Sequence, residues 1–483
     1  MATEAIDYSA EPSTRRPSAI RIPTLNGSPN GSPNGNATKP EPEAPPPDPD
    51  PLSDPQPLGA RRASHSTTAT ARRESHSAPS DFVVLERIPT FLQPSLPWRD
   101  RLLHFTFAWY TVTMSTSGVS LVLAIAPKRF PGLSTLGLVI FLLDLLFFLF
   151  ITAAISLRFM LYKHTLRRAF TRPSEALFVP TLMLSLAAII SNIAEYTRLF
   201  LSPRSGGAIS RFLEVAFWSY LVVTFLLSIL QYHLLFTVKA DRRLAISSMT
   251  PAWILPIFPV MLAGTIAGGA AKNLPAERAV SVLAAGLAAQ GLGFLVSAFF
   301  YATYLGRLMA HGLPVQRPGM FIAVGPPSFT CAAFVAIAAE MPRIFAELSA
   351  PGEVGKVGGI LVSDLTGQGD VATLAAGIRV AAVVSGVFLW GLSFWFFTSA
   401  VVAVAAGMPD RKFHLSWWSF VFPNVGFTIS SIRIGNAVGS QGVLWTSTVM
   451  TAVLFVAWAF ILFRCVRAVR KREIVWPGHD EDA

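Results

Sequence analysis

The chain has 483 residues, of which 52% are hydrophobic and only 14% are charged, and its mean hydropathy is +0.50. This composition excludes a soluble globular protein, because so much apolar surface must face lipid. The formal net charge of +11 does not indicate nucleic acid binding, since most Lys and Arg residues flank apolar segments, where they orient membrane helices. We therefore expect a polytopic membrane protein. Its partners should include the lipid bilayer and should not include nucleic acid.

Residues 1–97 contain no long apolar run and are rich in Pro, Ser, Gly and Asn. This composition predicts a disordered cytoplasmic tail without a cleavable signal peptide. Within the tail, Ser18, Ser64 and Ser75 each follow a pair of arginines at the spacing Arg-Arg-X-Ser. Basic-directed kinases favour this pattern, so a kinase is a candidate partner. Arg and Ser are also common in disordered tails, which leaves a purely compositional origin open.

Ten apolar stretches follow, each long enough to cross a bilayer in about 20 residues. The run 372–406 exceeds one straight crossing, so it is expected to tilt or to extend beyond the bilayer. Lys and Arg gather before the first span, after the last and in alternate loops, which predicts that both termini are cytoplasmic. The predicted spans are 102–125, 134–161, 176–196, 211–237, 250–271, 279–309, 319–340, 372–406, 415–436 and 441–466.

Prolines lie inside four of the odd-numbered spans and inside none of the even-numbered spans. A proline frees a backbone carbonyl, which a membrane tolerates only where protein or a water-filled cavity satisfies it. The first span has no interior proline, but Ser115–Gly118 supplies a small polar stretch at similar depth. We therefore predict five kinked inner helices that line a pathway and five straighter outer helices. The interior prolines are Pro180, Pro256, Pro259, Pro326, Pro327 and Pro423.

Ionisable groups inside the spans are few, and each one marks a pathway or a partner because burial in lipid is costly. Asp144 is predicted to be structural and to meet a donor on a neighbouring helix or subunit. Glu195, Arg198, Arg379 and Arg433 lie near an interface, where long side chains can reach water. No cation lies at the centre of an odd-numbered span, so anion selectivity would come from helix ends, backbone amides and polar side chains.

The sequence contains no nucleophile–base pair, metal-ligand cluster, phosphate loop or cofactor fingerprint, so we expect no enzyme activity, no cofactor and no metal. Its two cysteines, Cys331 and Cys465, lie in or beside apolar spans and are expected to be small buried hydrophobic residues.

Two segments are distinctive: RPGMFIAVGPPSFT from Arg317 and SWWSFVFPNVGFT from Ser416. With shorter matches between about 100 and 466, they resemble fungal malic acid transport proteins. These belong to the tellurite-resistance and dicarboxylate transporter family, to which plant slow anion channels are related. The resemblance does not extend to the N-terminal tail at residues 1–97.

The resemblance implies an all-α membrane protein whose ten helices form five hairpins around a central pore, assembled as a homotrimer in the plasma membrane. The transporter domain would span 98–470, followed by a short cytoplasmic tail at 471–483. Phe422, beside Pro423, occupies the position of the pore-occluding phenylalanine. Many relatives have a glycine-rich Met-Gly-Thr-Gly in the first helix, where this chain has Met114–Ser117.

We expect small organic or inorganic anions to pass along polar groups and helix breaks of the odd-numbered spans. Beside the interior prolines, the predicted pathway residues are Ser115, Thr116, Ser117, Gly118, Ser328, Thr330 and Asn424.

The favoured function is transport of malate and related C4-dicarboxylates through a pore gated by Phe422. An alternative on the same scaffold is sulfite efflux, which uses a smaller anion. An alternative of another class is a membrane sensor that does not transport and is regulated through phosphorylation of its tail.

We predict that Ser18, Ser64 and Ser75 are phosphorylated, because each follows an arginine pair that a basic-directed kinase recognises. Mass spectrometry of the native protein, purified from several growth conditions, tests this. If all three serines are unmodified in every condition, the hypothesis is wrong.

Overall fold

The computed structural model describes residues 97–201, 206–348 and 371–475, and the regular structure in these ranges is helical. Eight helices in the described part of the chain are long and apolar enough to cross a membrane. The expected all-α polytopic membrane protein is thus confirmed, while the count of ten crossings stays a prediction. The tail predicted at 1–97, with its three candidate phosphoserines, falls outside the described residues except for Pro97, and so do residues 476–483.

Five segments each consist of a short leading element and a longer α-helix, and we call them the inner segments. They are η1 (Phe107–Trp109) with α3 (Tyr110–Ile125), α6 (Pro173–Ala176) with α7 (Thr181–Phe200), η5 (Pro251–Ile254) with α9 (Phe258–Ala270), η7 (Arg317–Val324) with α11 (Gly325–Leu348), and η8 (Leu415–Phe420) with α14 (Phe422–Val438).

Each inner segment is followed along the chain by one long helix, and we call these the outer helices. They are α4 (Leu133–Leu161), α8 (Gly206–Phe236), α10 (Ala276–His311), α13 (Val371–Ala405) and α15 (Gln441–Arg470). The short elements that remain are α2 (Trp98–Leu102), α5 (Lys163–Thr171), η3 (Ala240–Arg242), η4 (Ile246–Ser248) and η6 (Ala271–Asn273).

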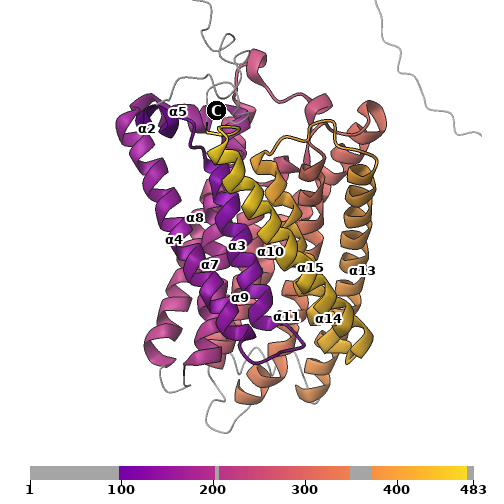
Figure 1. The fold of residues 1–483 in the computed structure, drawn as a ribbon. Helices are drawn as coiled ribbons and strands as arrows, with labels where there is room; N and C mark the ends of the chain where they lie inside the picture. The colour runs from indigo at the N-terminus through magenta and orange to yellow at the C-terminus, as the bar shows by residue number, and fades with distance from the viewer. Residues whose placement is uncertain (1–96, 202–205, 349–370, 476–483) are drawn as a thin grey trace, which may run out of the picture. The chain divides into compact units, whose positions relative to one another are not determined.

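The inner segments form a ring in which α3 packs on α7, α7 on α9, α9 on α11, α11 on α14, and α14 on α3. Each outer helix packs on the inner helix that precedes it, as expected for five hairpins. The two kinds of segment differ in burial. In the inner segment Arg317–Leu348, 94% of an apolar stretch of 18 residues is buried, whereas the value is 17% for the outer helix at Ala372–Ala405. Figure 1 shows α4 and α13 at opposite edges of the bundle.

The inner segments are broken rather than kinked. Pro259 and Pro423 lie in the first turn of α9 and α14, Pro180 is the N-cap of α7, and Pro326 and Pro327 follow the first residue of α11. A proline in the first helical turn costs little, because the N–H groups of that turn have no intrahelical acceptor. The predicted mid-helix kinks are therefore corrected to helix starts.

The first inner segment breaks at Tyr110, not at the predicted flexible stretch Ser115–Gly118, which lies inside the continuous helix α3. Without a proline there, the backbone stays helical, and the Thr116 hydroxyl donates back to the carbonyl of Val112 at 2.8 Å. The long run near 372–406 is likewise one continuous helix, α13, about 52 Å long at 1.5 Å per residue.

Side chains of the outer helices satisfy carbonyls that lie at the breaks. Three tyrosines from α8 and α10 donate their hydroxyls to backbone oxygens of η5, α9 and η7, so groups that hydrocarbon would leave unpaired are hydrogen-bonded inside the protein. The bonds run from Tyr220 to Pro259 at 2.9 Å, from Tyr232 to Trp253 at 3.0 Å and from Tyr301 to Ala323 at 2.8 Å.

A buried ion pair fixes α4 to α6. The guanidinium of Arg158 bonds both carboxylate oxygens of Glu175, with an Nη2–Oε2 distance of 3.2 Å, and also donates to the carbonyl of Phe105 at 3.2 Å. The two side chains are only 2% and 1% exposed. Because both charges are removed from water, the loss of either partner leaves the other unpaired in the interior.

Glu175→Gln should destabilise the protein by about 3–5 kcal/mol, because it leaves the Arg158 charge buried without its partner. The measurement is the thermal unfolding midpoint of the detergent-purified protein. Asp241→Asn is the control, since the Asp241–Arg242 pair is about two-thirds exposed and such pairs contribute about 0–1 kcal/mol. Equal midpoints for the two variants would contradict the prediction.

Candidate functional site

The leading elements and first turns of the five inner segments surround a cavity of about 270 Å³, which we call the upper cavity. Each inner segment contributes to its wall, and no Lys, Arg, Asp or Glu of the described residues lines it. Its polar lining consists of hydroxyl groups, one carboxamide and two imidazoles. These side chains are His104, Thr106, Thr111, Ser174, Thr181, Thr250, Gln316, His414, Ser416 and Ser419.

Four helix N-termini meet around the upper cavity. The first turns of α3, α7, α9 and α14 line it, whereas the fourth inner segment contributes through η7 and the residue before it. The N–H groups of a first helical turn lack intrahelical acceptors and carry partial positive charge. Several of these N–H groups donate to carbonyls of the leading elements, as Thr181 does to Phe178 and Phe258 to Leu255. The cavity therefore offers an anion polar side chains and the partial positive charge of helix ends, without a Lys or Arg among its described lining residues.

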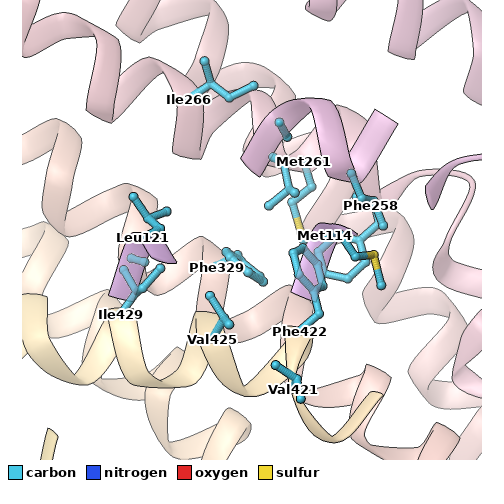
Figure 2. Packing of buried hydrophobic residues seen from close by; sticks show 14 of the residues in the cluster. Met114, Leu121, Phe258, Met261, Ile266, Phe329, Val421, Phe422, Val425 and Ile429 are labelled. Atoms are coloured by element: carbon cyan, nitrogen blue, oxygen red, sulfur yellow. The ribbon is translucent and has the colours of Figure 1, made fainter. Parts of the chain in front are cut away.

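Phe422 lines the upper cavity and is buried. Its side chain is 2% exposed, and its ring centroid lies 6.1 Å from that of Phe258 and 5.4 Å from that of Phe329. Figure 2 shows these rings beside Met114. A second space of about 20 Å³ lies beyond them and is also lined by Phe422. Phe422 thus lines both spaces, Phe258 lines only the upper cavity and Phe329 lines only the smaller space.

The break between η8 and α14 puts Phe422 in this position. The backbone carbonyl of Trp418 accepts the last hydrogen bond of η8 from the N–H of Val421. The helix α14 begins at the next residue, with Pro423 in its first turn. Because proline has no N–H to donate, it cannot continue the hydrogen-bonding pattern of η8. Phe422 and Pro423 both line the upper cavity, as the pattern of an aromatic next to a proline predicts for a pathway.

Two glycines make room for the partner rings of Phe422. A Cβ atom at Gly325 would lie 2.6 Å from the ring of Phe258, and one at Gly426 would lie 2.7 Å from the ring of Phe329. Neither the two rings nor the two glycines are among the predicted site residues. Phe258 stands between two prolines in Pro256–Pro259, so the pattern that identified Phe422 could also have identified Phe258.

The hydroxyls predicted along α3 bond to neighbouring helices. Thr116 accepts from the indole of Trp458 at 3.1 Å, and Ser117 accepts from the carboxamide of Asn192 at 2.9 Å. Ser115 donates to the carbonyl of Trp418 at 3.5 Å. None of the three lines the two spaces beside Phe422, whereas Gly118 lines the smaller space.

The other predicted polar residues are also held by hydrogen bonds within the ring. Ser328 donates to the carbonyl of Val324 at 2.7 Å, and Asn424 donates to that of Phe420 at 2.9 Å. Thr330 accepts from the side chain of Gln290 at 2.8 Å. They line neither space, and the same is true of Pro180, Pro256, Pro259, Pro326 and Pro327. Their part in transport stays a prediction.

Asp144 is fully buried on α4. Its polar neighbour is the hydroxyl of Ser117 on the adjacent helix α3, where a donor was predicted, although neither carboxylate oxygen meets the strict geometry of a hydrogen bond. Asp144 lines neither space beside Phe422, consistent with its predicted place outside the pathway.

Comparison with known proteins places this arrangement in a family. The sequence profile described as voltage-dependent anion channel (SLAC1) matches residues 104–466. A malic acid transport protein of Schizosaccharomyces pombe is 32% identical over 397 residues, which cover 81% of this chain and 84% of that protein. A putative malic acid transport protein of the same organism is 33% identical over 398 residues, which cover 80% and 85%.

A more distant relative is the sulfite efflux pump SSU1 of Trichophyton rubrum. It is 23% identical over 363 residues, which cover 74% of this chain and 89% of that protein. The resemblance drawn from the two distinctive sequence segments is therefore confirmed.

Gly426→Ala should destabilise the protein by about 1–3 kcal/mol, because the added methyl group would press on Phe329 at 2.7 Å and on the Ser328 hydroxyl at 2.8 Å. The measurement is the thermal unfolding midpoint in detergent. Gly291→Ala on α10 is the matched control, since no atom lies within 4 Å of its added Cβ. A midpoint for Gly426→Ala equal to that of the control would refute the tight packing of Phe329.

Proposed function

The chain belongs to the voltage-dependent anion channel family, and on that premise we propose that it carries malate and related C4-dicarboxylates through the ring of inner segments, past Phe422. Anion transport is the function of the family, and two relatives that are about one-third identical over most of their length are named as malic acid transport proteins. Their similarity exceeds that of the sulfite efflux pump, which is 23% identical.

The observation that supports the proposal is that Phe422 lines both the upper cavity and the smaller space. A closed aromatic plug stops ions because it leaves no room for their hydration water and offers no polar group in exchange. In our proposal, rotation of Phe422 joins the two spaces and opens the pathway.

The upper cavity suits an anion that must leave as readily as it enters. Helix N-termini and hydroxyls attract a carboxylate weakly from several directions, whereas a buried Lys or Arg would hold a dianion tightly. We propose that a dicarboxylate waits in the upper cavity until Phe422 moves.

We further propose that the protein is a homotrimer in the plasma membrane with both termini cytoplasmic. The excess of Lys and Arg on one side of the spans supports the orientation. The outer helices expose large apolar side chains, such as Leu146, Phe299 and Phe388, which fit lipid or a neighbouring copy. On this orientation, the upper cavity opens toward the cytoplasm.

Sulfite efflux is the second candidate, supported by the relationship to the sulfite efflux pump. A cavity without fixed charge would also admit a smaller anion, so the geometry of the upper cavity does not separate the two substrates.

Phe422→Ala should raise the rate of anion passage, because it removes the ring that separates the two spaces. A barrier lowered by about 1.4 kcal/mol would raise the rate ~10-fold. The measurement is uptake of labelled malate, with sulfite tolerance in parallel, in a transport-deficient yeast at matched surface expression. Malate uptake without a sulfite phenotype supports the proposed substrate, and sulfite tolerance without malate uptake supports the alternative.

Phe427→Ala is the control for the gate. Phe427 lies on the same helix and is equally buried, but its ring packs on Trp390 and Phe397 of the outer helix α13 rather than lining either space. A Phe422→Ala rate that is unchanged or lower, or an equal rise in the control, would count against the gate.

A further inference from the structure

A third cavity, of about 220 Å³, lies at the opposite end of the ring, and we call it the lower cavity. Its lining comes from η6 after α9, from the C-terminal halves of α11 and α14, and from the first turns of α13. Arg433 follows Phe422 by three helical turns, or about 16 Å along α14. The lower cavity therefore belongs to the end of the ring remote from the Phe422 plug.

Three cationic side chains line the lower cavity: Lys272, Arg379 and Arg433. No described Asp or Glu lines it, and Asn436 supplies a carboxamide. This lining is opposite in kind to that of the upper cavity, which has hydroxyls and helix ends but no fixed cation.

Among the described residues, Lys272 is the one of the three cations that forms an ion pair, while the charges of Glu195 and Glu340 also act on Arg433 from a longer distance. The ammonium group of Lys272 lies 2.8 Å from an oxygen of Glu195, whose other oxygen lies 2.8 Å from the guanidinium of Arg198. Glu195 is buried, so the prediction that it lies at an interface with water is corrected for its side chain. It holds Lys272 at the wall of the lower cavity.

The guanidinium groups of Arg379 and Arg433 form no ion pair or hydrogen bond with any described residue. The Nε atom of Arg433 is buried without an acceptor, while Arg379 is exposed at the start of α13. A buried donor without an acceptor costs free energy that a bound anion would recover. Arg433 was predicted to lie near an interface where its side chain reaches water. In the structure it is partly buried beside the lower cavity.

Arg433 and Lys272 face the same space from different parts of the ring. Arg433 lies on α14 and Lys272 follows α9, and α11 stands between these two helices in the ring. Burial lowers the pKa of Lys272 below its ordinary value, and the nearby charge of Arg433 lowers it further. Like charges brought together in this way attract an anion between them.

We propose that the lower cavity is a binding site for a small carboxylate or oxyanion, held by Arg433 and Arg379 with Lys272 beside them. The proposal rests on the proposed function in one respect, namely that the bound anion is the transported one. A planar guanidinium can donate two parallel hydrogen bonds to one carboxylate, and Arg433 and Arg379 together could engage both ends of a dicarboxylate. The site would then concentrate anions at one mouth of the pathway by fixed charge.

The phosphate of an anionic lipid has the same recognition chemistry, and α13 is an outer helix. The experiment therefore needs one arm for soluble anions and one for lipid. Purified protein in a neutral detergent is mixed with malate, with sulfate or with phosphatidylglycerol, and the thermal unfolding midpoint is recorded. A ligand that binds the folded state raises this midpoint in proportion to its occupancy.

We expect malate and sulfate to raise the midpoint of the wild-type protein, and Arg433→Gln and Arg379→Gln each to weaken the apparent affinity roughly 10-fold. Arg433→Lys should retain part of the effect because it keeps the charge. Arg278→Gln is the control, since Arg278 lies near the same end but pairs with Glu214 and does not line the cavity. Arg379 is exposed, so its variant tests the site even if Arg433→Gln does not fold.

A second readout is malate flux in proteoliposomes of phosphatidylcholine. We expect the KM for malate to rise about 10-fold in both arginine variants, with the maximal rate little changed, when malate is supplied from the side of the lower cavity. If anions stabilise the protein through Arg433 and Arg379 but malate is not transported, the binding site is supported and the proposed substrate is wrong. Stabilisation by phosphatidylglycerol alone, or equal anion affinity in all variants, would overturn the site.

Discussion

The structure depends on how the carbonyls at the five helix breaks are satisfied. In hydrocarbon an unpaired backbone group costs several kcal/mol, so a broken helix needs a donor from the protein. Tyr220, Tyr232 and Tyr301 supply such donors from α8 and α10. The outer helices α8 and α10 therefore do more than shield the inner segments from lipid, since they also satisfy carbonyls of η5, α9 and η7.

The breaks in turn create the two features on which the proposed function depends. They bring four helix N-termini to the upper cavity, and they turn Phe422 toward Phe258 and Phe329. The two ends of the ring then differ in their electrostatics. Partial charges surround the upper cavity, whereas Lys272, Arg379 and Arg433 bring fixed charge to the lower one. A pathway with unlike ends can hold an anion loosely at one mouth and more firmly at the other.

Much of the architecture could be predicted because it is local in the sequence. The helical class and the alternation of inner segments with long outer helices agree with the predicted spans, and Phe422 and Pro423 line the upper cavity. The form of the breaks was misjudged, because a proline in the middle of a long apolar run can either kink one helix or begin a second. The hydroxyls of Ser115–Ser117 were assigned to the pathway, yet they bond to Trp418, Trp458 and Asn192, which are distant in the chain.

The sequence by itself determined the membrane class and the order of inner and outer segments, since hydropathy and proline chemistry act over a few residues. Only the tertiary structure decided which charges are paired. Lys272 lies against Glu195, and Arg433 finds no partner among the described residues, because ring closure sets distances between residues far apart in the chain. Spacing along one helix cannot show what a side chain meets on another helix, and that contact decides whether a cation is structural or free to bind an anion.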